Sequence, residues 1–388
     1  MNIGVVGHVD HGKTSVVKAI TEEWADRHSE EIKRGITIKL GYADAEICKS
    51  KEGYCTKASL KQKDPKFIRK ISFVDCPGHE SLMAIMLSGA SLMNGAILII
   101  AANEKCPQPQ TAEHLAALEI AGIKNIIIIQ NKIDLVTPEQ AKENYESIKN
   151  FTRGSIAENA PIIPVAAHYN ININEVLKAI EEIIKTPKRD SKKDFRMLIA
   201  RSFDINKPNS KIKDLKGGVI GGSILQGIVK IGDEIEILPG IKQKEKYIPL
   251  RTKVTSISIK DGLIKEGKPG GLIGLGTQLD SSLTKSDNLI GNLVGKTGTL
   301  PPVKNELIIE QKLFNKIVEA ERIDPIKVNE ILVINAGTAT TVGVVKQVKK
   351  NKIHLNLKKP ICSEKGDKVG LSRKSATRWY LIGYGVVE

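Results

Sequence analysis

The sequence predicts an α/β domain followed by two antiparallel β-barrels. In the first half, short β-branched runs alternate with stretches of helical periodicity, which is typical of a sheet with crossover helices. After residue 194, glycine becomes frequent and short alternating strands with Gly-Asp turns replace most helical patterns, which indicates closed barrels. The 388 residues, 41% of them hydrophobic, are enough for two or three domains with buried cores.

The domain boundaries follow from changes in composition. A charged stretch after Pro187 predicts a linker, and Leu300–Pro302 predicts a second break. One helical pattern remains in the second half, at Glu310–Val318. The expected domains are 1–187 for the α/β domain, 195–300 for the first barrel and 303–388 for the second.

The α/β domain is expected to contain five strands that alternate with helices. Such an order favours parallel pairing in a doubly wound sheet. The expected strands are Asn2–Val6, Ile71–Val74, Ala96–Ala101, Asn125–Gln130 and Ile162–Val165. The expected helices begin near Lys13, Glu80, Thr111, Pro138 and Asn172.

The segment Gly7–Thr14 has the pattern G-x-x-x-x-G-K-T between a predicted strand and a predicted helix. In this context the backbone N–H groups surround phosphates, Lys13 reaches the outer phosphates, and the Thr14 hydroxyl binds Mg²⁺. The residues expected to bind the nucleotide on this side are Asp10, His11, Gly12, Lys13, Thr14 and Ser15.

Three further segments end predicted strands, where open α/β sheets bind ligands. At Asp75–Gly78, the carboxylate of Asp75 can hold Mg²⁺ through water and the Gly78 N–H can meet a γ-phosphate.

At Asn131–Asp134, the Asp134 carboxylate can accept from guanine N1–H and the exocyclic amine, and the Lys132 stem can cover the base. A backbone N–H from Ala166, Ala167 or His168 can donate to guanine O6. Together with the phosphate loop, these segments predict GTP as the nucleotide.

Two segments carry the predicted switch and hydrolysis chemistry. Thr37, within Arg34–Ile38, can bind Mg²⁺ only when its loop closes over the γ-phosphate. His79 is the candidate that orients the attacking water, although it could instead cap the helix that follows. Val9 and Ile36 could form an apolar gate that controls access of His79 to the water.

Asp10 is an acidic residue within a phosphate-binding loop, so its position needs an explanation. A second Mg²⁺, held also by the Gly35 carbonyl, would relieve its repulsion from the phosphates. A hydrogen bond from the loop backbone to Asp10 explains the residue equally well.

The motifs GHVDHGKT, RGITI, DCPGH and NKID, followed by two barrels, resemble the translation-factor class of GTPases. Within that class the chain resembles the gamma subunit family of archaeal and eukaryotic translation initiation factor 2, over nearly its whole length. The segments that carry this resemblance are Lys39–Asp44, Leu87–Ala90, Pro107–Thr111, Arg201–Asp204, Asn206–Pro208, Lys216–Ser223, Ser281–Lys285 and Arg378–Gly385.

The resemblance implies a GTPase that binds methionyl initiator tRNA in its GTP state. It also implies association with alpha and beta subunits, and release of GDP-bound factor after hydrolysis on the small ribosomal subunit. Tyr42 is the residue we expect beside the methionylated end of the tRNA, where an aromatic ring could stack on a base or cover methionine. A half-buried strand tyrosine is an equally good interpretation.

The sequence departs from the family pattern at two places. The family commonly has a zinc knuckle with two C-x-x-C motifs, but the insertion here (about 48–66) has only Cys48 and Cys55. Because a structural zinc ion needs four ligands, we expect no zinc. Ala166 stands where the family usually has Ser, so guanine specificity would depend on the Ala167 N–H.

The formal charge of +15 suits a partner with a phosphate backbone, although a lysine-rich genome would give the same excess. The second barrel is basic, which fits contact with tRNA or ribosomal RNA, or a solvated rim. Its basic residues are Lys346, Lys349, Lys350, Lys352, Lys358, Lys359, Lys365, Lys368, Arg373, Lys374 and Arg378.

Five scattered cysteines, no signal peptide and no long apolar run predict a soluble, cytoplasmic protein without a membrane partner. Two other functions fit the same domain order. One is an elongation factor for selenocysteinyl-tRNA, and the other is the GTPase subunit of a sulfate-activating adenylyltransferase. The segments Lys39–Asp44 and Pro107–Thr111 favour initiation over both.

Overall fold

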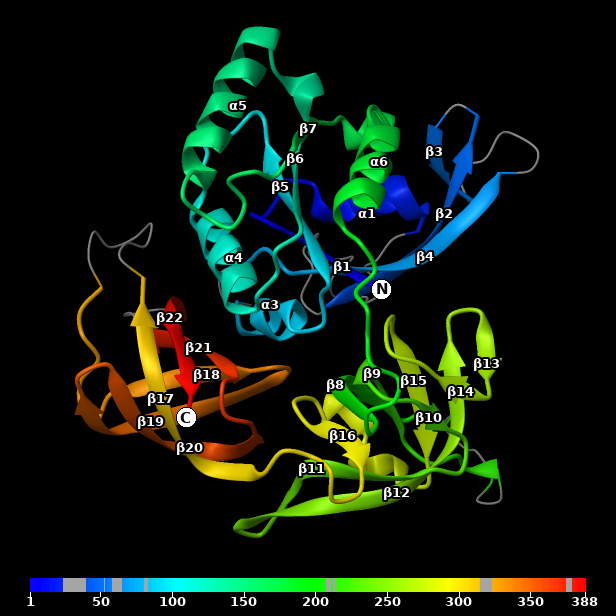
Figure 1. Cartoon of the computed structure of the whole chain (residues 1–388), viewed down its shortest axis with the longest axis vertical. Coiled ribbons are helices and arrows are strands. Elements are labelled where there is room, and N and C mark those ends of the chain that lie inside the picture. The colour runs from blue at the N-terminus through cyan, green and yellow to red at the C-terminus, as the bar shows by residue number, and fades with distance from the viewer. Residues whose placement is uncertain are drawn as a thin grey trace. The chain divides into compact units, whose positions relative to one another are not determined.

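The computed structural model describes residues 1–23, 40–51, 53–57, 65–79, 83–206, 211, 214–314, 323–374 and 379–388. The chain divides into two compact units. The first contains residues 1–187 with segments 314–324 and 375–382, and the second contains residues 188–313, 325–374 and 383–388. The first unit includes the α/β domain, and most of the two barrels belongs to the second (Figure 1). The predicted fold class is therefore confirmed.

The α/β domain is built on a seven-stranded sheet in the order β3-β2-β4-β1-β5-β6-β7. Its strands are β1 (Asn2–Gly7), β2 (Gly41–Ser50), β3 (Gly53–Thr56), β4 (Lys66–Asp75), β5 (Gly95–Ala101), β6 (Ile126–Asn131) and β7 (Ile162–Pro164). The five predicted strands are the parallel ones. The hairpin of β2 and β3 was not predicted, and it adds two antiparallel strands at one edge, so the sheet is mixed.

Helices cover both faces of this sheet (Figure 1). They are α1 (Lys13–Thr21), α3 (Met83–Ala90), α4 (Pro109–Ile120), α5 (Pro138–Thr152) and α6 (Ile173–Ile183). The apolar sides of α1 and α6 share one core with β1, β5 and β6, whose members include Val17, Ile20, Leu177, Ile97 and Ile127. This packing fixes the start of α1 against the carboxyl end of β1, where the phosphate loop lies.

Two helix starts differ from the prediction by one or two residues. Helix α4 begins at Pro109 rather than Thr111, because proline is well suited to the first turn of a helix. Helix α6 begins at Ile173 because Asn172 has a left-handed backbone conformation, with φ of 61°. The predicted start near Glu80 lies outside the described residues.

The first barrel contains β8 (Arg196–Phe203), β9 (Val219–Gln226), β11 (Glu234–Gln243), β12 (Lys246–Ile259), β15 (Ile273–Thr277) and β16 (Leu293–Lys296). Pairing of β11 with β12 closes the sheet, whose other pairings run β11-β16-β8-β9-β15-β12. Strand β13 (Gly262–Ile264) pairs antiparallel with β12, and β10 (Val229–Lys230) pairs with β14 (Glu266–Gly267). Alternate side chains such as Met197, Ile199, Ile235 and Ile237 fill the interior.

The second barrel is closed in the order β17-β20-β19-β18-β21-β22. Its strands are β17 (Val303–Leu313), β18 (Ile331–Ala336), β19 (Ala339–Lys349), β20 (Lys352–Cys362), β21 (Lys368–Lys374) and β22 (Trp379–Val387). The predicted helix at Glu310–Val318 is wrong over Glu310–Leu313, which belongs to β17. Earlier in β17, the buried residues Leu307 and Ile309 alternate with exposed ones, and pairing of this strand with β20 and β22 outweighs the local helical pattern. Residues 315–318 lie outside the described part.

Candidate functional site

The phosphate loop connects β1 to α1 and folds tightly around its own backbone. Gly12 has φ of 88°, and a Cβ there would lie 2.3 Å from the side-chain nitrogen of Asn131. The Lys13 ammonium donates to the His8 carbonyl at 2.6 Å, and Lys13 is buried. The glycine thus permits the turn, and the lysine amino group lies over the loop, where it can meet a phosphate.

Thr14, Asp75 and Gly78 meet at the same edge of the sheet. The Thr14 hydroxyl donates to Asp75 Oδ2 at 2.7 Å, and Asp75 is fully buried at the end of β4. A Cβ on Gly78 would lie 2.4 Å from Lys13 Nζ and 2.9 Å from the Val9 nitrogen. The parallel pairing of β1 with β4 therefore brings together two segments that are about 60 residues apart in sequence, as predicted.

Asn131 connects the phosphate loop to the segment after β7. Its side-chain nitrogen donates to the His11 carbonyl at 2.9 Å, and its Oδ1 accepts from the Ala167 N–H at 3.2 Å. The amide expected to meet guanine O6 thus also holds Asn131 in place. Lys132 has a left-handed backbone conformation, with φ of 62°, and Asp134 is exposed after this turn.

The two residues beside Ala167 lie in different environments. Ala166 is buried, and His168 is exposed in the short helix η3 (Ala167–Tyr169). Ser15 lies in the first turn of α1. The residues predicted to bind the phosphates and those predicted to bind guanine therefore lie together at the carboxyl edge of the sheet.

Three histidines surround the phosphate loop: His11 and His114 are buried and His8 is half-buried. His11 was predicted to bind the nucleotide, but the contacts of these histidines with the loop were not predicted. His114 of α4 accepts the Gly7 N–H through Nδ1 at 2.9 Å, and burial lowers the pKa of His114 to about 3. His11 Nδ1 bonds the Ile99 carbonyl at 3.1 Å, and its Nε2 lies 3.3 Å from a Glu104 carboxylate oxygen. Burial is also the main cause that lowers the pKa of His8 and His11. In the sequence, the only signal for His114 was its place on the inner face of a predicted helix.

The structure describes only some of the remaining predicted residues. His79 is exposed and directly follows Gly78. Tyr42 is half-buried in β2 opposite Val74, which is the position of an ordinary strand tyrosine. Thr37, Gly35 and Ile36 lie outside the described residues. Asp10 is exposed with φ of 60°, and within the described residues, which include the whole phosphate loop, its side chain makes no hydrogen bond. The explanation by a hydrogen bond from the loop backbone is therefore wrong in this structure, and the explanation by a second Mg²⁺ stays a prediction.

The knuckle insertion contains Cys48 and Cys55, which face each other across the β2–β3 hairpin. Both cysteines are free thiols. Among the residues that the structure describes, no three His, Cys, Asp or Glu side chains group together as metal ligands. In the same part of the chain, no helix is long and apolar enough to cross a membrane.

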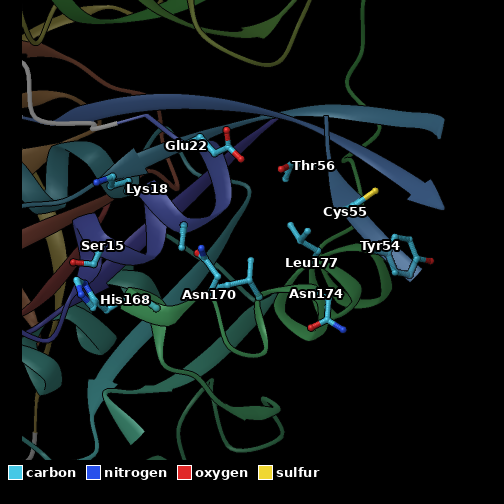
Figure 2. Close-up of a pocket in the computed structure, with 13 residues that line it drawn as sticks. Ser15, Lys18, Glu22, Tyr54, Cys55, Thr56, His168, Asn170, Asn174 and Leu177 are labelled. Carbon is cyan, nitrogen blue, oxygen red and sulfur yellow. The ribbon is translucent and has the colours of Figure 1, made fainter. Parts of the chain in front are cut away.

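A cavity of about 790 Å³ adjoins the guanine side of the site (Figure 2). It lies between α1, β3, η3 and the first turns of α6. Ser15, Ala167 and His168 line it together with ten residues that were not predicted to bind nucleotide.

Comparisons with known protein families match all three domains. The Elongation factor Tu GTP binding domain family matches residues 1–186, and Elongation factor Tu domain 2 matches residues 217–286. The family Initiation factor eIF2 gamma, C terminal, matches residues 305–387.

Among solved structures, a bacterial selenocysteine-specific elongation factor is similar, with a TM-score of 0.79 and 25% identity; the match covers all of this chain but 58% of that one. Elongation factor SelB of Methanococcus maripaludis, solved with a GTP analogue, has a TM-score of 0.75 and 24% identity, and 78% of it is covered. These are distant relatives that share the fold.

Sequence relatives are much closer. Translation initiation factor 2 subunit gamma of Methanocaldococcus jannaschii is 57% identical, over 100% of this chain and 97% of the relative. The proteins of the same name from Methanococcus vannielii and Pyrococcus furiosus are 56% and 53% identical, again over the whole of this chain. With its guanine-nucleotide site and barrels in the same order, this chain belongs to the gamma subunit family of translation initiation factor 2 and is a GTPase of translation initiation.

Proposed function

We propose that the phosphate loop and the three strand-end segments bind GTP and GDP in one continuous site. Lys13 contacts the outer phosphates, and the backbone from Asp10 to Ser15 surrounds the others. Asp134 selects guanine, the Lys132 stem covers the base, and the amides at Ala166–His168 face its O6. The observation that carries this proposal is the bridge through Asn131, which connects the phosphate side to the guanine side through two hydrogen bonds.

The same edge has the donor set that suits Mg²⁺. The Thr14 hydroxyl and the Asp75 carboxylate are 2.7 Å apart beside Lys13, and oxygen ligands are those that Mg²⁺ prefers. We assign direct binding to Thr14 and, in the closed switch, to Thr37, with Asp75 acting through water. The bound ion would neutralise phosphate charge as the γ-phosphate leaves. For a second Mg²⁺, Asp10 and Gly35 remain the candidate ligands.

His79 is proposed to orient the attacking water. It is exposed and next to Gly78, whose backbone lies against Lys13 and Val9, so its side chain can reach the γ-phosphate side of the loop. Because phosphoryl transfer depends on positioning, His79→Ala should slow GTP hydrolysis at least about tenfold and leave the affinity for GTP unchanged. His168→Ala is the matched control, an exposed histidine on the guanine side. Equal hydrolysis rates in wild type and His79→Ala would remove His79 from the mechanism.

In its GTP state the protein is proposed to bind methionyl initiator tRNA in the cytoplasm. It would act with alpha and beta subunits, deliver the tRNA to the small ribosomal subunit and leave as the GDP form. Support comes from identities of 53–57% to relatives named translation initiation factor 2 subunit gamma. Tyr42 remains the candidate contact for the methionylated end, and Tyr42→Ala should then weaken binding of charged tRNA.

The basic second barrel could contribute contacts to RNA phosphates. Some of its cations already have acidic partners, since Arg373 bonds Glu330 and Lys352 pairs with Glu388. Lys359 is partly buried, which lowers its pKa. The exposed lysines of the β19–β20 hairpin, including Lys346, Lys349 and Lys350, are better placed to meet a phosphate backbone.

The decisive experiment is protection of charged tRNA against deacylation, with a non-hydrolysable GTP analogue and with GDP. The panel contains methionyl initiator, methionyl elongator and selenocysteinyl tRNA, with and without the alpha subunit. Selective protection of the methionyl initiator tRNA in the GTP state is expected. Protection of none of the tRNAs, with GTP binding intact, would refute the carrier role.

A further inference from the structure

The cavity beside the guanine site extends beyond the residues of the proposed nucleotide site. It is a partly open pocket of about 790 Å³, within the range of volumes that hold a complete small ligand. Of its thirteen lining residues, only Ser15, Ala167 and His168 belong to the proposed nucleotide site. The other ten lie on α1 and at its C-terminal end, on β3, at the end of η3 and on α6 (Figure 2).

The position of the nucleotide determines which part of it faces this space. Its phosphates would lie at Lys13 and Thr14, and its base would lie between Asp134 and Ala167. The ribose connects these two ends, so it lies near Ser15, one residue beyond Thr14, and near the η3 segment. Because Ser15 and Ala167 also line the cavity, the sugar lies at its opening. A group attached to a ribose hydroxyl would therefore point into the cavity.

The cavity walls indicate the chemistry of such a group. Lys18 on α1 and Glu22, which follows the last residue of that helix, have opposite charges, so the formal charge that these two residues give the wall is zero. Tyr54 and Leu177 contribute apolar surface, and Asn174 contributes an amide. In Figure 2, Leu177 lies between the α1 side chains and the β3 strand. A wall that is neutral in sum and partly apolar suits an uncharged, flat group better than another phosphate.

We propose that this cavity binds an uncharged acyl or aromatic group attached to the 2′ or 3′ oxygen of the ribose of a guanine nucleotide. The inference rests on the proposed placement of the nucleotide. It adds a second compartment, which would distinguish ribose-substituted guanine nucleotides from GDP and GTP.

The test compares the dissociation constants of GDP and of N-methylanthraniloyl-GDP, which carries an aromatic acyl group on the ribose. Isothermal titration calorimetry measures both without relying on the fluorescence of the group. Wild type should bind the substituted nucleotide about tenfold more tightly than GDP, since the ring buries apolar surface in the cavity. The 2′-deoxy-3′-substituted and 3′-deoxy-2′-substituted forms then identify which oxygen carries the group into the cavity.

Asn174→Trp fills the cavity from the exposed start of α6, and Lys18→Trp fills it from α1. Lys178→Trp is the matched control, because Lys178 is exposed on α6 and does not line the cavity. Both filling variants should bind GDP as wild type does and lose the preference for the substituted nucleotide, and the control should keep it.

Equal affinities of wild type for the two nucleotides would overturn the proposal. So would a preference that persists in both filling variants, because the group would then lie elsewhere. Wild type that fails to bind GDP itself would instead refute the underlying nucleotide site, which is a distinguishable result.

Discussion

His114 provides the sharpest test of how the phosphate loop is held. Its Nδ1 accepts the Gly7 N–H at 2.9 Å in a fully buried position, 107 residues away in sequence. In His114→Ala this N–H loses its acceptor, which costs about 1–3 kcal/mol. The cavity left by the imidazole adds to this, since buried large-to-small changes cost about 2–5 kcal/mol. The free energy of unfolding should therefore fall by about 3–8 kcal/mol.

The same change should weaken nucleotide binding, because Gly7 begins the loop that surrounds the phosphates. We expect the dissociation constant of GDP to rise at least about tenfold, or 1.4 kcal/mol. Urea unfolding gives the stability, and GDP titration under conditions where circular dichroism shows a folded variant gives the affinity. His114→Asn keeps a side-chain oxygen acceptor and should restore a large part of both losses.

Leu118→Ala is the control for general destabilisation, since Leu118 is also fully buried on α4 but makes no hydrogen bond to the loop. It should lose about 2–5 kcal/mol of stability with GDP affinity unchanged. If His114→Ala bound GDP as tightly as wild type while folded, the reasoning that this histidine positions the loop would be refuted.

Three further predictions concern the same site. Because the pKa of His114 falls from 6.5 to about 3 on folding, the unfolded chain binds more protons between these values. Lowering the pH from 6.5 should therefore cost about 1.4 kcal/mol of stability per pH unit from this group. In His114→Asn, urea unfolding at several pH values should show that the free energy of unfolding depends less steeply on pH. An equal dependence on pH in the variant and in wild type would contradict the assignment. Asp134→Asn should weaken GDP binding about 100-fold, because guanine loses hydrogen bonds to a charged acceptor. The same variant should bind xanthosine diphosphate more tightly, because the C2 carbonyl of xanthine can accept from the new amide. Competition titration checks both affinities, and an unchanged GDP affinity would exclude Asp134 as the guanine contact. Gly78→Ala places a Cβ 2.4 Å from Lys13 Nζ and 2.9 Å from the Val9 nitrogen. The affinity for GTP should therefore fall about tenfold, and the affinity for GDP should fall less. A GTP affinity equal to that of wild type would show that the loop accommodates the methyl group without losing binding free energy.

The sequence by itself determined the class of fold and predicted the chemistry of the nucleotide site. Strand and helix patterns, together with short motifs at strand ends, depend on local spacing, so they can be recognised without coordinates. Thr14 and Asp75 were predicted to share an ion, and the structure places their side-chain oxygens 2.7 Å apart. The barrels were predicted from glycine-rich turns and alternation, which are also local features.

Tertiary structure decided the features that depend on packing between distant segments. The β2–β3 hairpin was not predicted, although Ala43, Ala45 and Ile47 alternate with more exposed residues along β2. Its place at the edge of the sheet depends on antiparallel pairing of β2 with β4. The residues after Glu310 have a helical sequence pattern but form a strand, because β17 pairs with β20 on one side and β22 on the other. His114 reaches Gly7, and the cavity beside α6 exists, only because the fold brings separate helices against the phosphate loop. No local pattern encodes such contacts, since each depends on how two elements far apart in sequence pack together.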